Sequence, residues 1–225
     1  MQAVILCGGL GERLRPYTET VPKVMLEFKG KPILEHVISY IKKYGIDDFI
    51  LLCGHKSDYI EKYFKDGKEF GVKISYSMEK EKLGTAGAVN NAKDLINDDF
   101  IIVNGDVITD FALGELLALF QKISKPIVTL VRPDNPYGVV ETENRNNGAK
   151  IKRFVEKPRM SEWVNAGYTV IPKGLVDIFQ EKGDIETTVY PKLVKDGKLH
   201  AYFLKDSCNW KSIDTHKDLK EVNTL

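Results

Sequence analysis

Short apolar runs alternate with stretches of helical spacing through the first 131 residues of this chain. The runs are rich in Val, Ile and Leu, which is typical of strands buried on both faces of a parallel sheet. Strands separated by helices in this way form right-handed βαβ units. The pattern therefore predicts a three-layer, Rossmann-like α/β fold with helices on both faces of a mixed, mostly parallel central sheet. We expect these strands at residues 3–7, 49–53, 73–77, 98–103 and 127–131.

The helices predicted between the strands carry start signals. A proline in the first turn and a Ser, Thr or Asp cap are the usual ones, because both suit backbone N–H groups that have no partner inside the helix. The expected start residues are Pro32, Ser57, Asp110 and Thr215, the last in a capping-box-like pair with Asp218.

Short strands become frequent after Arg132. The polar stretch at 143–148 is typical of a hairpin tip between strands at 139–142 and 151–156. We expect further strands at 168–171 and 201–204, and helical spacing at 175–179 and 189–194.

Composition limits the class of protein. With 225 residues, 43% of them hydrophobic, the chain is long enough for one sizeable core, so we expect a single domain over 1–225. A net charge of +1 disfavours binding to nucleic acid or to a membrane surface. No stretch approaches the ~20 apolar residues of a membrane span, and the apolar start ends too early for a signal peptide. The three scattered cysteines read as reduced core residues, so we expect a cytoplasmic protein.

A glycine-rich loop follows the first predicted strand. Gly8, Gly9 and Gly11 let the backbone bring its N–H groups close to a phosphate or a flat base, and Arg13 and Lys23 add positive charge. The loop lacks the G-K-[ST] end of a P-loop and the third glycine of a dinucleotide fingerprint. Glycines alone fit an ordinary tight turn equally well.

The combination G-G-x-G-x-R-L-R-P, Pro22-Lys23 and Gly30-Lys31-Pro32 resembles the sugar-1-phosphate nucleotidyltransferases. The resemblance covers essentially the whole chain. It implies a GT-A-like nucleotidyltransferase fold in which Arg13 and Lys23 neutralise the leaving pyrophosphate. It also implies that the loop holds the nucleotide through Leu6, Gly8, Gly9 and Gly11.

The stretch Leu83-Gly84-Thr85-Ala86-Gly87 opens a predicted helix. Small residues there let a planar base lie against the backbone, although a helix tightly packed on a strand needs them too. In the family this motif contacts the base, which implies nucleotide-binding roles for Leu83, Gly84 and Thr85. Glu79 stands where some relatives have a base-reading glutamine, which leaves the base preference open.

Two aspartates are candidate metal ligands. Asp106 follows a buried strand, where a carboxylate suits Mg²⁺ bridging nucleotide phosphates; the alternative is a turn residue capping the next helix. Most of the family has its second ligand where this chain has Ser212, and Asp214 falls two residues later. Because W-x-x-[MI]-D-T resembles the glucose-1-phosphate cytidylyltransferases, we assign the second ligand to Asp214, against the alternative that it caps the last helix.

The second half carries the segments that match the family's sugar-phosphate lobe. In Phe154-Val155-Glu156-Lys157-Pro158, Glu156 would accept hydrogen bonds from sugar hydroxyls and Lys157 would bind the phosphate. Gly138 and Asn165 match further sugar-contacting positions; an exposed Glu-Lys pair and a turn are the ordinary alternatives. The resemblance thus divides the chain into a nucleotide-binding half of about 1–132 and a sugar-phosphate lobe of about 133–215, with no C-terminal β-helix.

The implied reaction joins a nucleoside triphosphate and a sugar 1-phosphate into an NDP-sugar and pyrophosphate, with Mg²⁺ as cofactor. Segments similar to mannose- and heptose-1-phosphate guanylyltransferases favour GTP with a mannose-type sugar over CTP with glucose 1-phosphate, UTP or dTTP. A catalytically silent NDP-sugar-binding regulatory subunit is disfavoured because Arg13, Lys23, Asp106 and Lys157 are all present. A GT-A glycosyltransferase would normally carry D-x-D where this chain has Asn104-Gly105-Asp106. The oligomeric state stays open, and a homodimer is one assembly that the sequence allows.

Overall fold

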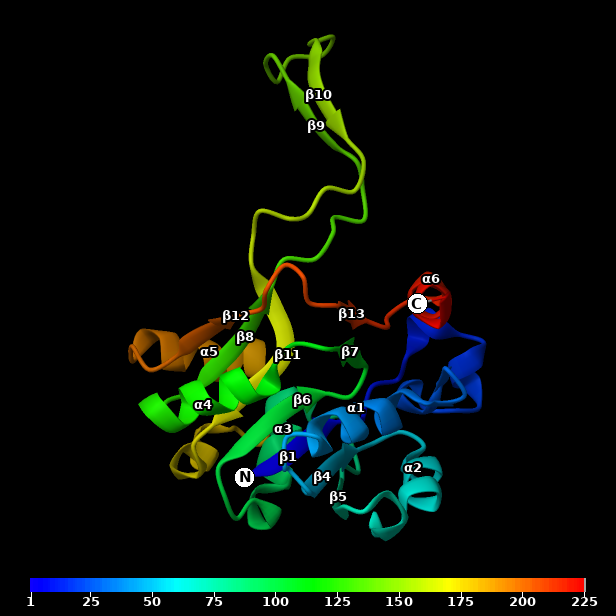
Figure 1. The fold of residues 1–225 in the computed structure, drawn as a ribbon, viewed down its shortest axis with the longest axis vertical. Helices are drawn as coiled ribbons and strands as arrows, with labels where there is room; N and C mark the ends of the chain where they lie inside the picture. Colours follow the sequence, from blue (N-terminus) through cyan, green and yellow to red (C-terminus); the bar gives the residue numbers. More distant parts are fainter. Residues whose placement is uncertain (225) are drawn as a thin grey trace.

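A seven-stranded sheet in the order β12-β8-β11-β6-β1-β4-β5 forms the centre of the protein (Figure 1). The structure is a computed structural model, and it describes residues 1–224. The strands of this sheet are β1 (Gln2–Leu6), β4 (Asp48–Cys53), β5 (Lys73–Met78), β6 (Phe100–Asn104), β8 (Ile127–Val131), β11 (Val164–Ile171) and β12 (His200–Phe203).

β11 is antiparallel to both of its neighbours, β6 and β8, and every other pairing in the sheet is parallel. The mixed, mostly parallel sheet is therefore confirmed. Because Leu6 pairs with both Leu52 and Asn104, the carboxyl ends of β1, β4 and β6 meet at one edge. In open α/β sheets, ligands bind outside this edge.

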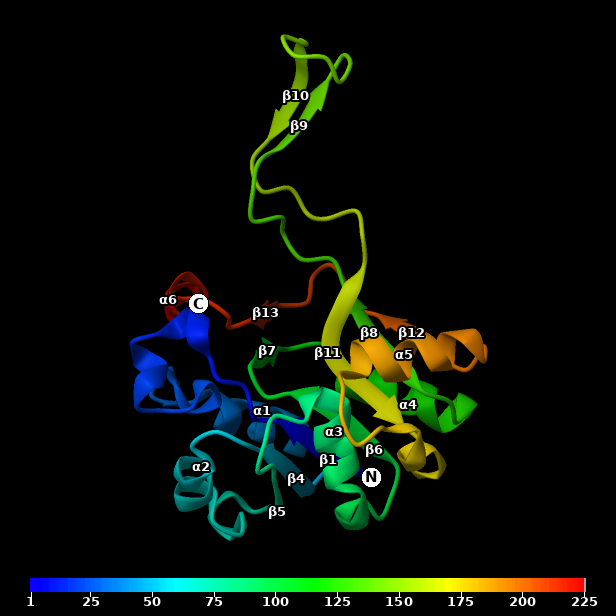
Figure 2. The ribbon, with the colours of Figure 1, turned by 180° about the vertical axis from the view of Figure 1, so that it is seen from behind.

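Helices cover both faces of the sheet, because successive side chains of a strand point to opposite faces. Ala3 and Ile5 of β1 pack with α1, α2 and α4, whereas Val4 packs with α3 and α5. The three predicted layers are thus present (Figures 1 and 2). The helices are α1 (Ile33–Lys42), α2 (Ser57–Phe64), α3 (Gly84–Asn91), α4 (Leu113–Ile123), α5 (Ile185–Lys195) and α6 (His216–Thr224).

Helix α2 begins at Ser57 as expected, but the predicted cap of α2 and the predicted first residue of α4 are wrong. The N-cap of α2 is Lys56 rather than Ser57, and no side chain caps it. Helix α4 starts at Leu113, because Asp110 bonds instead to Asn209, accepting from its backbone N–H at 2.8 Å and its side chain at 2.6 Å. Asn209, 99 residues away in sequence, thus binds the Asp110 carboxylate that the local pattern assigned to the start of α4.

A small third cluster ties the N-terminal loops to the end of the chain. It is made of the buried residues Leu14, Leu26, Phe28, Ile33 and Ile213. The two-stranded sheets β2 (Glu27–Phe28) with β3 (Lys31–Pro32), and β7 (Val107–Thr109) with β13 (Trp210–Ser212), flank it. The cluster places Asp214, next to Ile213, over the loop that carries Arg13 and Lys23.

The predicted hairpin forms an arm rather than part of the body. β9 (Val139–Thr142) and β10 (Ile151–Val155) pair antiparallel with each other and project far from the central sheet (Figures 1 and 2). The chain returns at Val164 to enter β11, and the short helix Lys173–Ile178 precedes α5. No helix in residues 1–224 is long and apolar enough to cross a membrane.

Candidate active site

A cleft of about 860 Å³ opens at the carboxyl edge of the sheet. Most of the predicted phosphate-handling residues line it: the glycines of the loop, Arg13, Lys23, Glu79, Asp106 and Asp214. Arg13 and Asp214 are 201 residues apart in sequence, so only the fold brings these residues together. Its lining residues are Gly8, Gly9, Leu10, Gly11, Glu12, Arg13, Lys23, Gly54, His55, Glu79, Lys80, Glu81, Lys82, Asp106 and Asp214.

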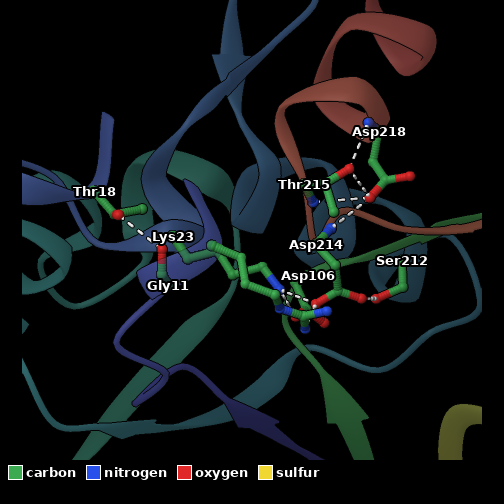
Figure 3. Close-up of polar contacts among 9 residues, drawn as sticks. Gly11, Thr18, Lys23, Asp106, Ser212, Asp214, Thr215 and Asp218 are labelled. Atoms are coloured by element: carbon green, nitrogen blue, oxygen red, sulfur yellow. Dashed lines mark hydrogen bonds and ion pairs between the residues drawn. The ribbon is translucent and has the colours of Figure 1, made fainter. Parts of the chain in front are cut away.

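The glycine loop needs two of its glycines for packing as well as for ligand approach. Gly11 has φ +63°, and a Cβ there would lie 2.8 Å from Cγ2 of Thr18, whose hydroxyl donates a 2.8 Å hydrogen bond to the Gly11 carbonyl (Figure 3). A Cβ on Gly8 would lie 3.0 Å from a carboxylate oxygen of Glu79. The loop is therefore held tightly against its neighbours.

Lys23 binds both of the aspartates that line the cleft (Figure 3). Its Nζ lies 2.5 Å from Oδ2 of Asp106 and 2.8 Å from Oδ1 of Asp214, and Nη2 of Arg13 lies 2.7 Å from the same Asp214 oxygen. Burial alone would lower the pKa of Lys23, but the attraction of Asp106 and Asp214 outweighs it and raises the pKa above its ordinary value. The ammonium group stays charged at neutral pH.

Both oxygens of the Asp214 carboxylate accept hydrogen bonds. The Ser212 hydroxyl donates to Oδ2 at 2.7 Å, while Lys23 and Arg13 hold Oδ1. Burial raises the pKa of Asp214, but the bonds from Lys23 and Ser212 outweigh it and leave the pKa lowered. The predicted capping box follows at once: the Thr215 and Asp218 side chains exchange bonds with each other's backbone N–H groups, at 3.3 and 2.8 Å.

The carboxylates of Asp106 and Asp214 fit a hard divalent cation. Both reach the single cation of Lys23 within 2.8 Å, so they converge on one small volume beside the cleft. No cluster of three or more His, Cys, Asp or Glu residues occurs in the described part of the chain. Mg²⁺ does not require one, because it usually binds through one or two carboxylates and completes its shell with water and phosphate oxygens.

A second hollow of about 270 Å³ adjoins the cleft at the start of α3. Its lining includes the predicted nucleotide-binding residues Leu6, Gly84 and Thr85. The residues that it shares with the cleft are Gly8, Gly9, Glu79, Lys82 and Asp106. Leu83 lies beside it, donating its N–H to Glu79 at 3.3 Å. The lining of the hollow combines the apolar side chains of Leu6 and Leu52 with the carboxylate of Glu79.

The first amides of α3 are not free for a ligand. Thr85 N–H donates to Asp184 at 3.1 Å, and Ala86 N–H donates to the Gly183 carbonyl at 2.9 Å. Gly84 has φ +80°, and a Cβ there would meet that carbonyl oxygen at 2.5 Å. Small residues at this helix start therefore serve close packing on the segment before α5, which is the ordinary alternative, as well as bordering the hollow.

The predicted sugar-phosphate residues lie elsewhere. Gly138, Glu156 and Lys157 belong to the arm, where the Lys157 ammonium lies 3.9 Å from the Glu156 carboxylate, and they line neither the cleft nor the hollow. Asn165 lies at the sheet end of the arm, in β11, where its side-chain oxygen accepts from the Gly167 N–H at 2.9 Å.

Several residues that line the cleft or the hollow were not predicted from the sequence. Gly54 and His55 directly follow β4, so the rule that ligands gather at strand ends would have found them. Lys80 and Lys82 sit in the loop after β5 and could have been found in the same way. Asp184 carries no signal in the sequence, because its contact with Thr85 joins residues 99 apart.

Fold and site together give an α/β protein with a glycine loop, two cationic side chains and two carboxylates at the edge of a parallel-cored sheet, an arrangement suited to phosphate-bearing ligands. The chain belongs to the nucleotidyl transferase family, whose model matches residues 2–225.

Relatives of known sequence and structure agree with this class. The chain is 38% identical, over 97% of its length, to "Mannose-1-phosphate guanylyltransferase catalytic subunit beta" of Xenopus tropicalis, and 36% identical over 99% to "Bifunctional protein GlmU" of Methanococcus maripaludis. It spans 62% and 54% of those proteins.

Two solved structures share the fold. A putative glucose-1-phosphate thymidylyltransferase from Bacillus anthracis matches with a TM-score of 0.80 and 25% identity, covering 100% of this chain and 94% of that one. HddC from Yersinia pseudotuberculosis, complexed with GMP-PN, matches with a TM-score of 0.77 and 26% identity, covering 99% of this chain and 98% of that one.

Proposed function

We propose that this protein is a sugar-1-phosphate nucleotidyltransferase, which converts a nucleoside triphosphate and a sugar 1-phosphate into an NDP-sugar and pyrophosphate. The observation that carries the proposal is the convergence of Arg13 and Lys23 with Asp106 and Asp214 in one glycine-lined cleft. Membership of the nucleotidyl transferase family supports it.

In this reaction an oxygen of the sugar phosphate attacks the α-phosphorus of the triphosphate. A new P–O bond forms, and the bond from the α-phosphorus to the bridging oxygen breaks, so that the β- and γ-phosphates leave as pyrophosphate. The attacking oxygen is already anionic and needs no protein base. The obstacle is the meeting of two anions, so the residues act mainly by positioning and neutralising charge.

Each residue then has a role suited to its place. Lys23 and Arg13 stabilise the departing pyrophosphate, and the glycine loop holds the nucleotide through its N–H groups. Asp106 and Asp214 would hold Mg²⁺, which when bound would supply positive charge to the phosphate oxygens. Lys157 and Glu156 would hold the sugar phosphate and the sugar hydroxyls.

The preferred substrates are GTP and a mannose-type 1-phosphate, from mannose or heptose. The named activity of the Xenopus relative and the GMP-PN bound to HddC favour guanine. So does Glu79, since a carboxylate that lines the hollow accepts hydrogen bonds and guanine offers two adjacent donors. CTP with glucose 1-phosphate, UTP and dTTP are the alternatives.

The test is pyrophosphate release from a grid of GTP, CTP, UTP, dTTP and ATP against mannose, heptose and glucose 1-phosphates, with and without Mg²⁺. We expect release with GTP and a mannose-type sugar only when Mg²⁺ is added. No release in any cell of the grid would reject the enzyme in favour of a silent NDP-sugar-binding subunit.

We also propose a cytoplasmic location. Cys7 and Cys53 are buried thiols and Cys208 is a half-buried one, and all three are free. Free thiols in such number suit a reducing compartment.

A further inference from the structure

The arm exposes an apolar face that the body leaves uncovered. Val140 pairs with Phe154 and Thr142 with Ile151 across the hairpin, and the register shift between Ile151 and Arg153 puts Ile151 on the same face as Phe154. Val140 is 43% exposed, Ile151 61% and Phe154 62%. Exposed apolar patches of this kind mark binding surfaces, and an isolated two-stranded hairpin is marginally stable in water.

The arm contributes nothing to the core of its own body. None of the three buried clusters in the described residues includes a side chain between 132 and 163. Both views show the hairpin standing clear of the sheet and its helices (Figures 1 and 2). The apolar face is therefore available to another molecule.

The base of the arm is clamped, so its direction is set by the body. Arg132 and Arg159 both bind the Asp206 carboxylate, at 2.7 and 2.9 Å, and the Arg132 guanidinium lies 4.8 Å from the Trp163 ring. Backbone bonds from Asn135 to Pro158 and from Met160 to Pro133 join the two sides of the neck. These contacts join the neck of the arm to the segment that follows β12.

The cleft of one chain is incomplete for the proposed reaction. It gathers the triphosphate-handling groups, but Glu156 and Lys157, the residues proposed to hold the sugar phosphate, are carried away on the arm. An arm that holds substrate-binding residues outside its own cleft can present them to the cleft of another molecule. A second copy of this chain has that cleft.

The hairpin is also suited to pairing with itself. A two-fold contact uses the same patch on both copies, and here that patch is apolar along Val140, Ile151 and Phe154. The opposite face carries Glu141 across from Arg153, so both signs of charge are present for an antiparallel partner.

We propose that the arm joins two copies of this chain, and that Glu156 and Lys157 of each copy complete the sugar-phosphate side of the other copy's cleft. The second part rests on the proposed function; the first does not.

The first experiment measures molar mass by light scattering coupled to size-exclusion chromatography. We expect a dimer for the wild type and a monomer for the double variant Ile151→Ser and Phe154→Ser, with an unchanged circular dichroism spectrum because the arm lies outside the core. A monomeric wild type, or a double variant that stays dimeric, would overturn the interface.

The second experiment tests for shared sites. Lys23→Ala and Lys157→Ala chains carrying different affinity tags are co-expressed, and heterodimers are isolated by purification on both tags. Each variant alone should release pyrophosphate at about a hundredth of the wild-type rate or less. The heterodimer should recover about half, since one of its two clefts then has both lysines.

The outcomes separate the two claims. A heterodimer no more active than its parents, or a fully active Lys157→Ala homodimer, overturns the sharing of sites. A wild type that is dimeric but releases no pyrophosphate from any substrate pair overturns the proposed function and the sharing with it, while the arm interface stands.

Discussion

Lys23 determines how charge is balanced in the cleft of the free protein. It is mostly buried, and it neutralises two carboxylates that would otherwise repel each other at the edge of the sheet. Arg13 shares Asp214 but is largely exposed, so its contribution to the pair is weak in water. When an anionic substrate arrives, the ammonium group of Lys23 can exchange the carboxylates for phosphate oxygens, because both are anionic hydrogen-bond acceptors.

Lys23→Ala should lower pyrophosphate release by about 100-fold or more, because it removes a buried cation from the position where charge develops. Steady-state rates with saturating substrates measure the effect. Lys62→Ala, an exposed lysine on α2, serves as the control and should leave the rate unchanged. Circular dichroism checks that both variants are folded; a near-normal rate for folded Lys23→Ala would refute the mechanism.

Glu79→Gln should move the base preference from GTP towards UTP or dTTP. A carboxylate only accepts hydrogen bonds, which suits the two adjacent donors of guanine, whereas an amide offers one donor and one acceptor, which suits uracil or thymine. We expect kcat/KM for GTP to fall by at least about tenfold, since an unpaired donor then remains in the site. Glu115→Gln on α4, a carboxylate 2.7 Å from Lys205 that lines neither the cleft nor the hollow, is the control. An unchanged preference in Glu79→Gln would remove this residue from base selection.

At the scale of the elements, local periodicity predicted most of the sheet and its helices, because buried runs and amphipathic faces are properties of neighbouring residues. The predicted start of α4 was wrong because it depends on a residue distant in sequence: Asp110 binds Asn209 instead of starting the helix. β11 begins at Val164 instead of residue 168, because Asn165 and Gly167, with φ +84°, interrupt the apolar pattern and shift the register. Sequence motifs identified Lys23, Asp106 and Asp214. The contacts of Lys23 with the two carboxylates join residues up to 191 positions apart, so they could not be predicted from local sequence.

Glu35 joins α1 to α2 and should make stability depend on pH. The buried carboxylate accepts from Lys31 and from the Tyr63 hydroxyl, both at 2.6 Å. Burial raises the pKa of Glu35, but these two bonds outweigh it and lower the pKa. A carboxylate whose pKa is lowered by folding stabilises the folded state at pH values above its pKa in the unfolded chain, about 4.3. That stabilisation is lost as the pH falls through its pKa in the folded protein.

We therefore expect Glu35→Gln to cost about 1 kcal/mol of unfolding free energy at pH 7, and the difference from wild type to shrink below about pH 4. Urea unfolding at a series of pH values measures it. Glu69→Gln, an exposed carboxylate paired with Lys65, should show a smaller change at every pH. A Glu35→Gln difference that grows with acidity would contradict the assignment.

At the scale of the whole molecule, the chain separates into a body and an arm. The α/β class follows from the alternating pattern along the sequence, and the polar stretch at 143–148 marks the hairpin. The projection of that hairpin could not be predicted, because its alternating apolar residues look the same whether a body or a second molecule covers them. What fixes its direction is the clamp of Arg132, Arg159 and Asp206, which only tertiary structure brings together.

Replacing residues 139–155 by an Asn-Gly turn should leave the body folded and still able to bind nucleotide. The turn suits the two-residue link between antiparallel segments, and the deleted residues belong to none of the buried clusters in the described chain. The thermal midpoint should therefore shift by less than about 3 °C, the change that about 1 kcal/mol produces in a chain of this size. Titration with a fluorescent GTP analogue should show affinity close to wild type, because the cleft and the hollow are lined by body residues alone.

Turnover of the shortened chain should be lost even though Glu156 and Lys157 remain, because without the apolar face no second copy is held in place to receive them. Full turnover in this shortened chain would mean that one copy suffices, and a collapse of nucleotide binding would mean that body and arm are not separable.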